Sequence, residues 1–248
     1  MTSNRFFISQ ANIRSPYIFL EGEEHHHLSH VSRIKPKEKV WLFDGQGRSF
    51  LARVEEIEKG KTKLFILERR EGEEAKGKIT LAQAIIKSKS MEFVIQKSAE
   101  LGITSFIPVI TSRSIVKIEG KVEIKLERWQ KIAREAVKQC RSSWVPFILP
   151  PHPLKKLIKE TEAERKFLLS ENRGKYLKEI LLKSWESRKE KFPSSILILI
   201  GPEGGWTEEE EEYILNNGFE AVSLGKSILR TETAALCSLA LISHFWNL

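Results

Sequence analysis

The chain has 248 residues, of which 41% are hydrophobic and 30% are charged, with a mean hydropathy of -0.30. This composition excludes long disorder, a collagen-like repeat and a membrane bundle, and the length predicts roughly one to two domains. The formal net charge is +8, and its excess lies in residues 1–150, which carry 27 Lys and Arg against 18 Glu and Asp. That excess suits a polyanionic partner such as nucleic acid, and equally a solvated surface rich in Lys and Glu.

The first 70 residues predict short β-strands separated by turns. Strands are expected over residues 5–8, 17–20, 39–43, 48–57 and 62–69. Asp44-Gly45 is a hairpin signal between two of them. We therefore expect a small β-barrel-like domain over residues 1–72, followed by a polar, glycine-containing linker between Glu71 and Lys78.

The rest of the chain, residues 73–248, predicts alternating strands and helices. Strands are expected over residues 79–86, 106–110, 167–169, 196–200 and 220–224, and helices over 91–101, 123–139, 176–189, 208–217 and 232–246. Such alternation favours a parallel sheet with helices on both faces. Ligands of open α/β sheets bind at the carboxyl ends of strands, so chemistry is expected in the loops after Leu169, Ile200 and Leu224.

Rare residue types and missing patterns exclude several classes of protein. Cys140 and Cys237 are too far apart for a zinc ribbon or a disulfide framework, and we expect free, buried thiols. Asp44 is the single aspartate, and the side chains of the adjacent histidines 25–27 diverge, so no metal site is expected. No apolar run approaches the ~20 residues of a membrane-spanning helix and the first residues lack a signal-peptide pattern, so we expect a cytoplasmic protein with no membrane partner.

The segment Gly201 to Gly205, which reads GPEGG, joins an apolar strand to a predicted helix. Backbone N–H groups face the end of the strand in such a turn, and glycine permits close approach of a ligand. Glu203 would repel a triphosphate, whereas a nucleoside or a sulfonium ligand is compatible with it. A tight turn with no ligand is the alternative interpretation.

The segment from Leu224 to Ala234 also follows a strand and leads into an apolar helix. Its Gly-Lys-Ser resembles part of a phosphate-binding loop, but that motif needs a glycine where Glu220 stands, and no G-x-G-x-x-G opens a helix. An ATPase is therefore excluded, and a dinucleotide-binding domain is not supported. A threonine cap on the last helix and a pair between Arg230 and Glu232 remain the structural alternatives.

Several basic side chains follow predicted strands or turns, at positions suited to phosphate contact. Lys87 and Lys89 follow one strand, Arg113 follows the next, and Arg33 follows a short helical turn that begins at His26. We expect a basic rim that contacts phosphates, with a merely solvated rim as the alternative.

Together these segments resemble the RsmE-type family of 16S ribosomal RNA uridine-N3 methyltransferases, within the SPOUT superfamily. The resemblance is carried by Arg5-Phe6-Phe7, His26 to Arg33, Phe43-Asp44-Gly45, residues 87–102, GPEGG at 201–205 and LGKSILRTETAA at 224–235. It implies an N-terminal PUA-like RNA-binding β-barrel (1–72) and an α/β SPOUT methyltransferase domain with a parallel sheet and a C-terminal trefoil knot (73–248). It also implies S-adenosylmethionine as cofactor, a homodimer, and 16S ribosomal RNA or the small ribosomal subunit as partner.

The resemblance implies roles for particular residues. It places the cofactor at Leu169, Ser170, Glu171, Leu199, Gly201, Glu203, Gly204, Gly205, Leu224, Gly225, Ile228 and Leu229. RNA contacts are expected at Arg5, Arg33, Lys87, Lys89, Arg113 and Arg141, although the sequence departs from the family pattern at 141–144 and at Lys89-Ser90.

The expected reaction is methyl transfer to N3 of a specific unpaired uridine of small-subunit ribosomal RNA. Arg230 is expected to stabilise the developing uridine anion, and Glu232 to accept the proton or to hold Arg230. Two alternatives stay open: a non-catalytic RNA-binding ribosome-assembly factor, and a SPOUT methyltransferase that acts on another RNA.

Overall fold

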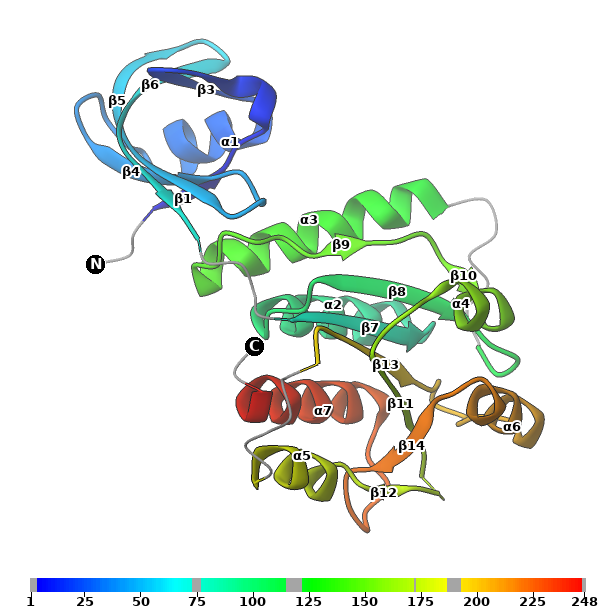
Figure 1. Cartoon of the computed structure of the whole chain (residues 1–248). Helices are drawn as coiled ribbons and strands as arrows, with labels where there is room; N and C mark the ends of the chain where they lie inside the picture. Colours follow the sequence, from blue (N-terminus) through cyan, green and yellow to red (C-terminus); the bar gives the residue numbers. More distant parts are fainter. Residues whose placement is uncertain (1–3, 73–76, 115–121, 172, 187–192, 247–248) are drawn as a thin grey trace. The chain divides into compact units, whose positions relative to one another are not determined.

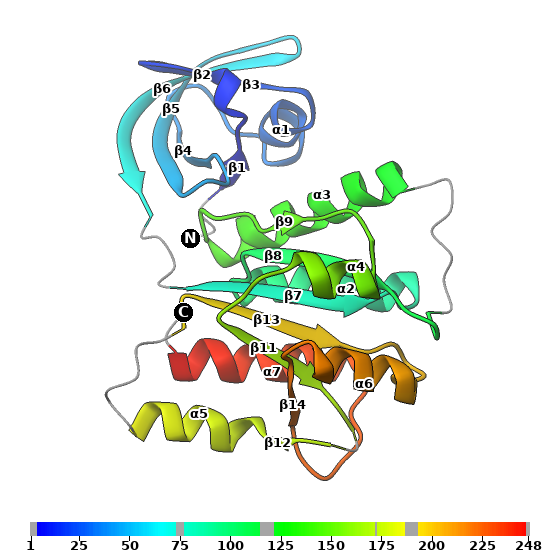
Figure 2. The ribbon, with the colours of Figure 1, turned by 45° about the vertical axis from the view of Figure 1, so that its right-hand side comes forward.

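The computed structural model describes residues 4–72, 77–114, 122–171, 173–186 and 193–246. Its internal contacts divide the chain into two compact units. The first contains residues 1–74 together with 137–145, and the second contains residues 75–136 and 146–248. Figures 1 and 2 show the elements of each unit in sequence colours.

The first unit is a curled six-stranded sheet with three short helical turns among the described residues. Its strands are β1 (Arg5–Phe7), β2 (Ile13–Arg14), β3 (Tyr17–Glu21), β4 (Lys39–Phe43), β5 (Arg48–Glu58) and β6 (Lys61–Glu71), in the order β1-β4-β5-β6-β3-β2. A 3₁₀ turn η1 (Gln10–Asn12), the helix α1 (Gly22–His26) and the π-helical turn η2 (His27–Val31) complete it. β1 runs parallel to β4 and the remaining pairs are antiparallel, so the sheet is mixed.

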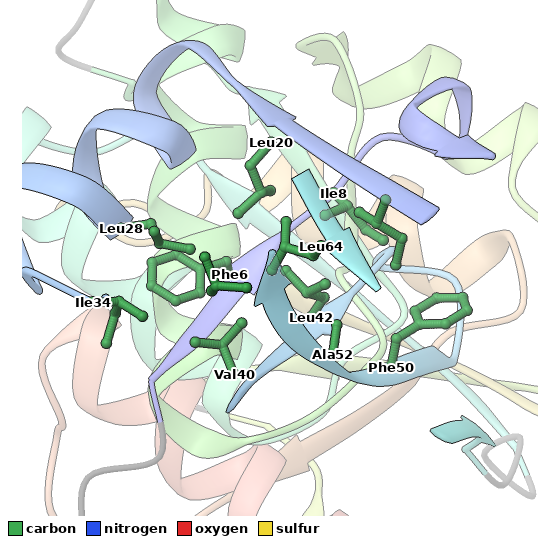
Figure 3. Close-up of a cluster of buried hydrophobic side chains, with 12 residues drawn as sticks. Phe6, Ile8, Leu20, Leu28, Ile34, Val40, Leu42, Phe50, Ala52 and Leu64 are labelled. Atoms are coloured by element: carbon green, nitrogen blue, oxygen red, sulfur yellow. The ribbon is translucent and has the colours of Figure 1, made fainter. Parts of the chain in front are cut away.

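The core of this unit comes from the inward-facing side chains of the sheet and from α1 to η2. Figure 3 shows Phe6, Leu20, Leu28, Leu42 and Leu64 directed into one cluster, and all five are almost fully buried. Alternate residues of the strands point the other way, as the two-residue period of a strand requires. The strands predicted from hydrophobic alternation are therefore confirmed by their burial.

The predicted hairpin joins β4 to β5. The buried carboxylate of Asp44 accepts hydrogen bonds from the backbone N–H groups of Gln46 and Arg48 and from Nε of Arg48 at 2.5 Å. Gly45 and Gly47 both adopt positive φ, at 75° and 93°, which glycine tolerates without steric cost. The turn is thus fixed by its own side chains.

The second unit is a wholly parallel sheet. Its strands are β7 (Lys78–Ala84), β8 (Ser105–Ile110), β9 (Phe147–Ile148), β10 (His152–Pro153), β11 (Arg165–Leu169), β12 (Lys175–Tyr176), β13 (Ser195–Ile200) and β14 (Glu220–Ser223). The order is β10-β8-β7-β13-β11-β14-β12, with β9 paired to β8. All the pairs are parallel, as the βα alternation predicted.

Helices cover both faces of this sheet. They are α2 (Ser88–Glu100), α3 (Val122–Cys140), α4 (Leu154–Glu160), α5 (Leu177–Glu186), α6 (Glu208–Asn216) and α7 (Thr231–Trp246). On one face, α4 and α6 pack on a cluster that contains Leu197 and Leu199 of β13. The helix α7 contacts β13 and lies between α2 and α5, and Figures 1 and 2 show α7 running alongside α5.

Several predictions need correction or lie outside the described residues. The thiol of Cys237 is exposed on α7 and Cys140 is partly exposed, so the expectation of buried thiols was wrong. The sequence pattern also missed the short helix α4. The last residues of the helix expected over 176–189 and part of the predicted linker, residues 73–76, lie outside the described residues. None of the described helices combines the length and apolarity needed to span a membrane.

Candidate active site

A cavity of about 660 Å³ lies at the carboxyl ends of β11, β13 and β14. These three strands are neighbours in the parallel sheet, so their carboxyl ends meet at one edge. The walls come from residues 169–171, from 200–206 and from 223–232, with Lys87, Arg113 and Glu211 beside them. The edge of the sheet identified from the strand pattern is therefore hollowed.

Most of the residues singled out in the sequence come together in this cavity. Its lining includes Leu169, Ser170, Glu171, Gly201, Glu203, Gly204, Gly205, Leu224, Gly225, Ile228, Leu229, Arg230 and Glu232, and also Lys87 and Arg113. Leu199 does not line it; the side chain is fully buried against α4 and α6, and the next residue, Ile200, reaches the cavity wall.

The GPEGG loop and the adjacent Trp206 are held in place by hydrogen bonds with two other segments. Nη1 of Arg113 donates hydrogen bonds to the carbonyl oxygens of Gly204 at 2.7 Å and Trp206 at 3.1 Å. The indole Nε1 of Trp206 donates to the carbonyl oxygen of Leu169 at 3.2 Å. Gly205 adopts a φ of +68°, which favours glycine. The loop after β13 is thereby tied to the end of β11.

The helix after this loop begins with a capping box. The Thr207 hydroxyl accepts from the backbone N–H of Glu210, whose carboxylate accepts from the backbone N–H of Thr207. The same carboxylate accepts from the N–H of Ser112 at 2.7 Å. The start of α6 is therefore fixed both to its own first turn and to the segment after β8.

Gln83 joins the loop after β13 to the start of α7. This fully buried residue of β7 directs Nε2 toward the carbonyl oxygen of Gly201 at 3.3 Å and toward Oγ1 of Thr231 at 3.0 Å. The Thr231 hydroxyl in turn donates to the carbonyl oxygen of Gly201 at 2.6 Å. Thr231 lies between Arg230 and Glu232, so this network fixes the backbone that carries both side chains.

The buried carboxylate of Glu211 forms part of the cavity wall beside Ser170. Glu211 is 8% exposed, and its Oε1 accepts a hydrogen bond from the Ser170 hydroxyl at 2.5 Å. It lies in the first turns of α6, where the helix dipole favours a negative charge. In the sequence, Glu211 is one of five consecutive glutamates at 208–212, and no local feature distinguishes it from its neighbours.

The cavity carries both signs of charge and several aliphatic side chains. Lys87, Arg113, Lys226 and Arg230 contribute cations, Glu171, Glu203, Glu211 and Glu232 contribute carboxylates, and Leu169, Ile200, Leu224, Ile228 and Leu229 contribute apolar surface. Such a lining suits a ligand with an apolar ring system and separate positive and negative groups.

The guanidinium of Arg230 is exposed at this cavity. Among the described residues it makes no ion pair and no side-chain hydrogen bond. Glu232 is partly exposed in the first turn of α7, and the described ion pairs include none between these two. Arg230 is therefore available to a bound ligand.

The remaining basic residues proposed for RNA contact do not line the cavity. Arg5 is half-buried in the first unit, where it donates to the carbonyl oxygen of Ser142 at 2.6 Å and to the hydroxyl of Ser143 at 2.8 Å. Its guanidinium also stacks on the ring of Phe43, and burial lowers its pKa from the usual range. Arg33, Lys89 and Arg141 are exposed, and both Arg33 and Arg141 adopt positive φ.

The histidine-rich turn has structural contacts of its own. Nδ1 of His25 lies 2.8 Å from the Thr62 hydroxyl, and burial lowers the pKa of this imidazole. The rings of His26 and His30 stack with centroids 4.7 Å apart. In the described part of the chain, no three His, Cys, Asp or Glu side chains are grouped in a way that could hold a metal ion.

Comparison with known proteins gives matches over nearly the whole chain. A family model described as an RNA methyltransferase domain matches residues 73–243, and a model described as an RNA methyltransferase PUA domain matches residues 20–67. The ribosomal RNA small subunit methyltransferase E of Bacillus subtilis is 33% identical over 245 residues, which cover 97% of this chain and 96% of the relative.

Solved structures agree with this finding. The ribosomal RNA small subunit methyltransferase E from Neisseria gonorrhoeae, bound to S-adenosyl methionine, has a TM-score of 0.85 and 36% identity, with 98% of each chain covered. A putative methyltransferase from Legionella pneumophila, in complex with the bound cofactor SAM, has a TM-score of 0.87 and 32% identity over 98% of this chain and 97% of its own.

Proposed function

This chain belongs to the RNA methyltransferase family, and we propose that it methylates N3 of one specific uridine in small-subunit ribosomal RNA. It is an S-adenosylmethionine-dependent methyltransferase of 16S ribosomal RNA. The observation that carries the proposal is the cavity at the ends of β11, β13 and β14, which brings Arg230 together with the GPEGG loop.

The lining of the cavity fits S-adenosylmethionine. Ile228, Leu229 and Leu224 provide apolar surface for an adenine ring, while carboxylates and cations together suit a ligand that carries an amino group, a carboxylate and a sulfonium. Gly204 carries no side chain over the loop backbone, and a Cβ built there would meet only Arg113, at 3.5 Å. When bound, the cofactor supplies an electrophilic methyl group. We assign its binding to the three loops that form the walls.

The residues of the chain then have to bind the uridine and stabilise its anion. N3 of uridine must lose a proton to become a good nucleophile, and base pairing occupies it in a duplex, so the target is an unpaired or flipped base. Arg230 faces the cavity with no ionic partner among the described residues, and it stabilises the negative charge on the pyrimidine ring. Glu232 is the second candidate, as proton acceptor or as the partner that orients Arg230.

We propose that residues 73–248 contain a C-terminal trefoil knot. The three segments that form the cavity are then the counterparts of the knot loops of the SPOUT family. In that topology, the hydrogen bonds from Trp206 to Leu169 and from Thr231 to Gly201 fasten the three segments to one another.

We also propose that the protein acts as a homodimer in the cytoplasm, where its ribosomal substrate is located. The helix α7 is strongly apolar and leaves a stripe exposed, formed by Thr233, Cys237, Ala240 and His244. These residues recur every three or four positions, so they share one face of the helix. A second copy of the chain would cover that face.

The assignment of Arg230 is tested by methyl transfer from labelled S-adenosylmethionine to small subunits that lack the modification. Arg230→Ala should lower kcat by about 10²- to 10³-fold, the range for loss of one preorganised anion-stabilising group, while the Kd for the cofactor changes little. Arg165→Ala is a matched control, because Arg165 pairs with Glu220 at the amino end of β11, away from the cavity.

Full activity of Arg230→Ala would remove Arg230 from the mechanism. If the parent protein binds the cofactor but transfers no methyl group to any RNA, a non-catalytic assembly factor is favoured. Transfer to transfer RNA alone would indicate a related methyltransferase with a different substrate.

A further inference from the structure

The outward face of the first unit carries a row of aromatic and basic side chains. The pairing registers of β2, β3, β6, β5 and β4 place Arg14, Tyr17, Phe65, Arg53 and Lys39 directly beside one another across five strands. The inward neighbours of these residues form the core in Figure 3, so the row itself faces outward. We call these five residues, with Phe19, Lys61 and Lys63 next to them, the outer row.

The rings of the outer row are partly exposed and lie under cations. Lys63 Nζ is 4.3 Å from the ring centroid of Tyr17, and Lys61 Nζ is 4.2 Å from that of Phe19. The rings of Tyr17 and Phe65 meet edge to face at 5.6 Å. Tyr17, Phe19 and Phe65 are all half-buried. Three aromatic rings thus lie on the outer face of the sheet and are not part of the buried core cluster.

The charge of the outer row is mainly positive. Glu21 lies 3.8 Å from Lys61, and Glu55 pairs with Arg53 at 2.7 Å. For Arg14, Lys39 and Lys63, the described residues provide no carboxylate within ion-pair distance. Arg14 lies over the ring of Phe19, as Lys63 lies over that of Tyr17. The three cations thus have no carboxylate to neutralise them and can contact an anionic partner beside the rings.

Adjacent rings flanked by cations without a carboxylate partner match the chemistry of single-stranded nucleic acid. Bases stack on aromatic side chains, and every base has a π-face, so such stacking tolerates many sequences. Lysine and arginine contact the backbone phosphates and release counterions. An acidic protein surface would use the cations but would have no use for the rings.

We propose that the outer row binds an unpaired stretch of RNA, with bases on Tyr17, Phe19 and Phe65 and phosphates on Arg14, Lys39 and Lys63. The inference that this RNA belongs to the substrate rests on the proposed function. This surface lies wholly within the first unit and shares no residue with the cavity. Its role is to hold the substrate RNA at nucleotides other than the one that is methylated.

The test measures binding of the full chain to a fluorescein-labelled oligouridine of about 12 nucleotides, a length within the site sizes of single-strand binders. Fluorescence anisotropy gives the Kd at several salt concentrations. The ring variant is Phe19→Leu with Phe65→Leu, and the charge variant is Lys63→Gln. Matched controls in the second unit are Phe147→Leu, an exposed ring on β9, and Lys155→Gln, a lysine over the ring of Tyr213.

The ring variant should raise the Kd about tenfold and leave its salt dependence unchanged, because stacking involves no counterions. Lys63→Gln should weaken binding and reduce the slope of log K against log salt by about 0.7, the value for one phosphate contact on a single strand. Neither control should change the Kd by more than about twofold. Circular dichroism checks that each variant is folded. If the ring variant does not fold, the surface substitution Lys63→Gln provides the test.

A Kd within twofold of the parent for the folded ring variant would overturn the proposal. Equal displacement of the oligouridine from the parent chain and the ring variant by polyglutamate would likewise indicate a general electrostatic surface. The readout is separate from catalysis, since cofactor affinity should be the same in every variant. If neither the parent chain nor any variant transfers a methyl group although RNA binding is intact, the proposed function is refuted and the outer-row proposal stands.

Discussion

Replacement of Gln83 by methionine should separate activity from stability. Gln83 is buried in β7, and its amide Nε2 is within hydrogen-bond distance of the oxygens of Gly201, Thr231 and Ala84. The opposite amide orientation would direct Oε1 at two carbonyl oxygens, so the donor must face this side. Methionine has a similar length and fills buried space well, but it cannot donate.

The cost to folding should be small. The lost bonds share one nitrogen and are long, and a buried hydrogen bond contributes only about 0.5–1.5 kcal/mol net. The Gly201 carbonyl keeps the 2.6 Å bond from the Thr231 hydroxyl, so it is not left unpaired. The substitution also removes Oε1 of Gln83, a buried atom with no hydrogen-bond partner among the described residues. We therefore expect the free energy of unfolding to change by about 1 kcal/mol or less.

The effect on catalysis should be larger. The network positions Thr231, and with it Arg230 and Glu232, against the GPEGG loop. A displacement of about 1 Å of a positioning group can lower a rate by up to about 100-fold, so we expect kcat to fall roughly 10- to 100-fold. Ser98→Ala is the matched control, because it removes another buried side-chain hydrogen bond, to Ile95 in α2.

The assay combines denaturant unfolding with steady-state methyl transfer at saturating cofactor and RNA. A kcat within twofold of the parent for Gln83→Met would refute the positioning role. So would an equal loss of kcat in Ser98→Ala, because the effect would then follow stability rather than the network.

Two further predictions concern the cofactor loop and the first unit. Gly204→Ala should preserve the fold, because its Cβ would make only ordinary contact with Arg113 at 3.5 Å. The new methyl group should block close approach of the ligand and raise the Kd for S-adenosylmethionine, measured by calorimetry, at least about tenfold. An unchanged Kd would contradict the assignment of this loop to the cofactor. The lowered pKa of buried His25 means that the unfolded chain binds more protons below pH 6.5, so the free energy of unfolding should fall as pH decreases from about 6.5. His25→Asn should weaken this dependence in pH-dependent denaturation, and an identical pH profile would show that other groups cause it.

Hydrophobic period and turn residues were sufficient to predict most of the fold. The strand predicted over 39–43 has the same bounds as β4, and the Asp44-Gly45 hairpin lies where it was expected. Both follow from local chemistry, namely alternation of buried residues and a turn that requires positive φ. The parallel sheet followed from the alternation of strands and helices.

Features that depend on tertiary contacts were not predictable from local pattern. The helix α4 has only seven residues and directly follows a proline-rich stretch, so its periodicity is too short to detect. The grouping of residues 137–145 with the first unit depends on contacts such as Arg5 with Ser142, which are 137 positions apart in sequence.

The same distinction holds for the candidate site. Glycine-rich loops after apolar strands located the cavity, because strand ends of a parallel sheet meet at one edge. Leu199 and Ile200 belong to one apolar run that is buried on both faces, so the sequence could not tell which of them reaches the cavity. Gln83 and Glu211 have no distinguishing local pattern, and their importance follows only from what they contact in the folded chain.

The most direct test of the proposed function is the position of the transferred methyl group. Small ribosomal subunits from cells that lack the modification are incubated with the protein and labelled S-adenosylmethionine, and the RNA is digested and mapped by mass spectrometry. We predict label on N3 of a single uridine of 16S ribosomal RNA, appearing about 10²- to 10³-fold more slowly with Arg230→Ala. Label on another atom or another RNA, or no label despite intact cofactor binding, would contradict the account.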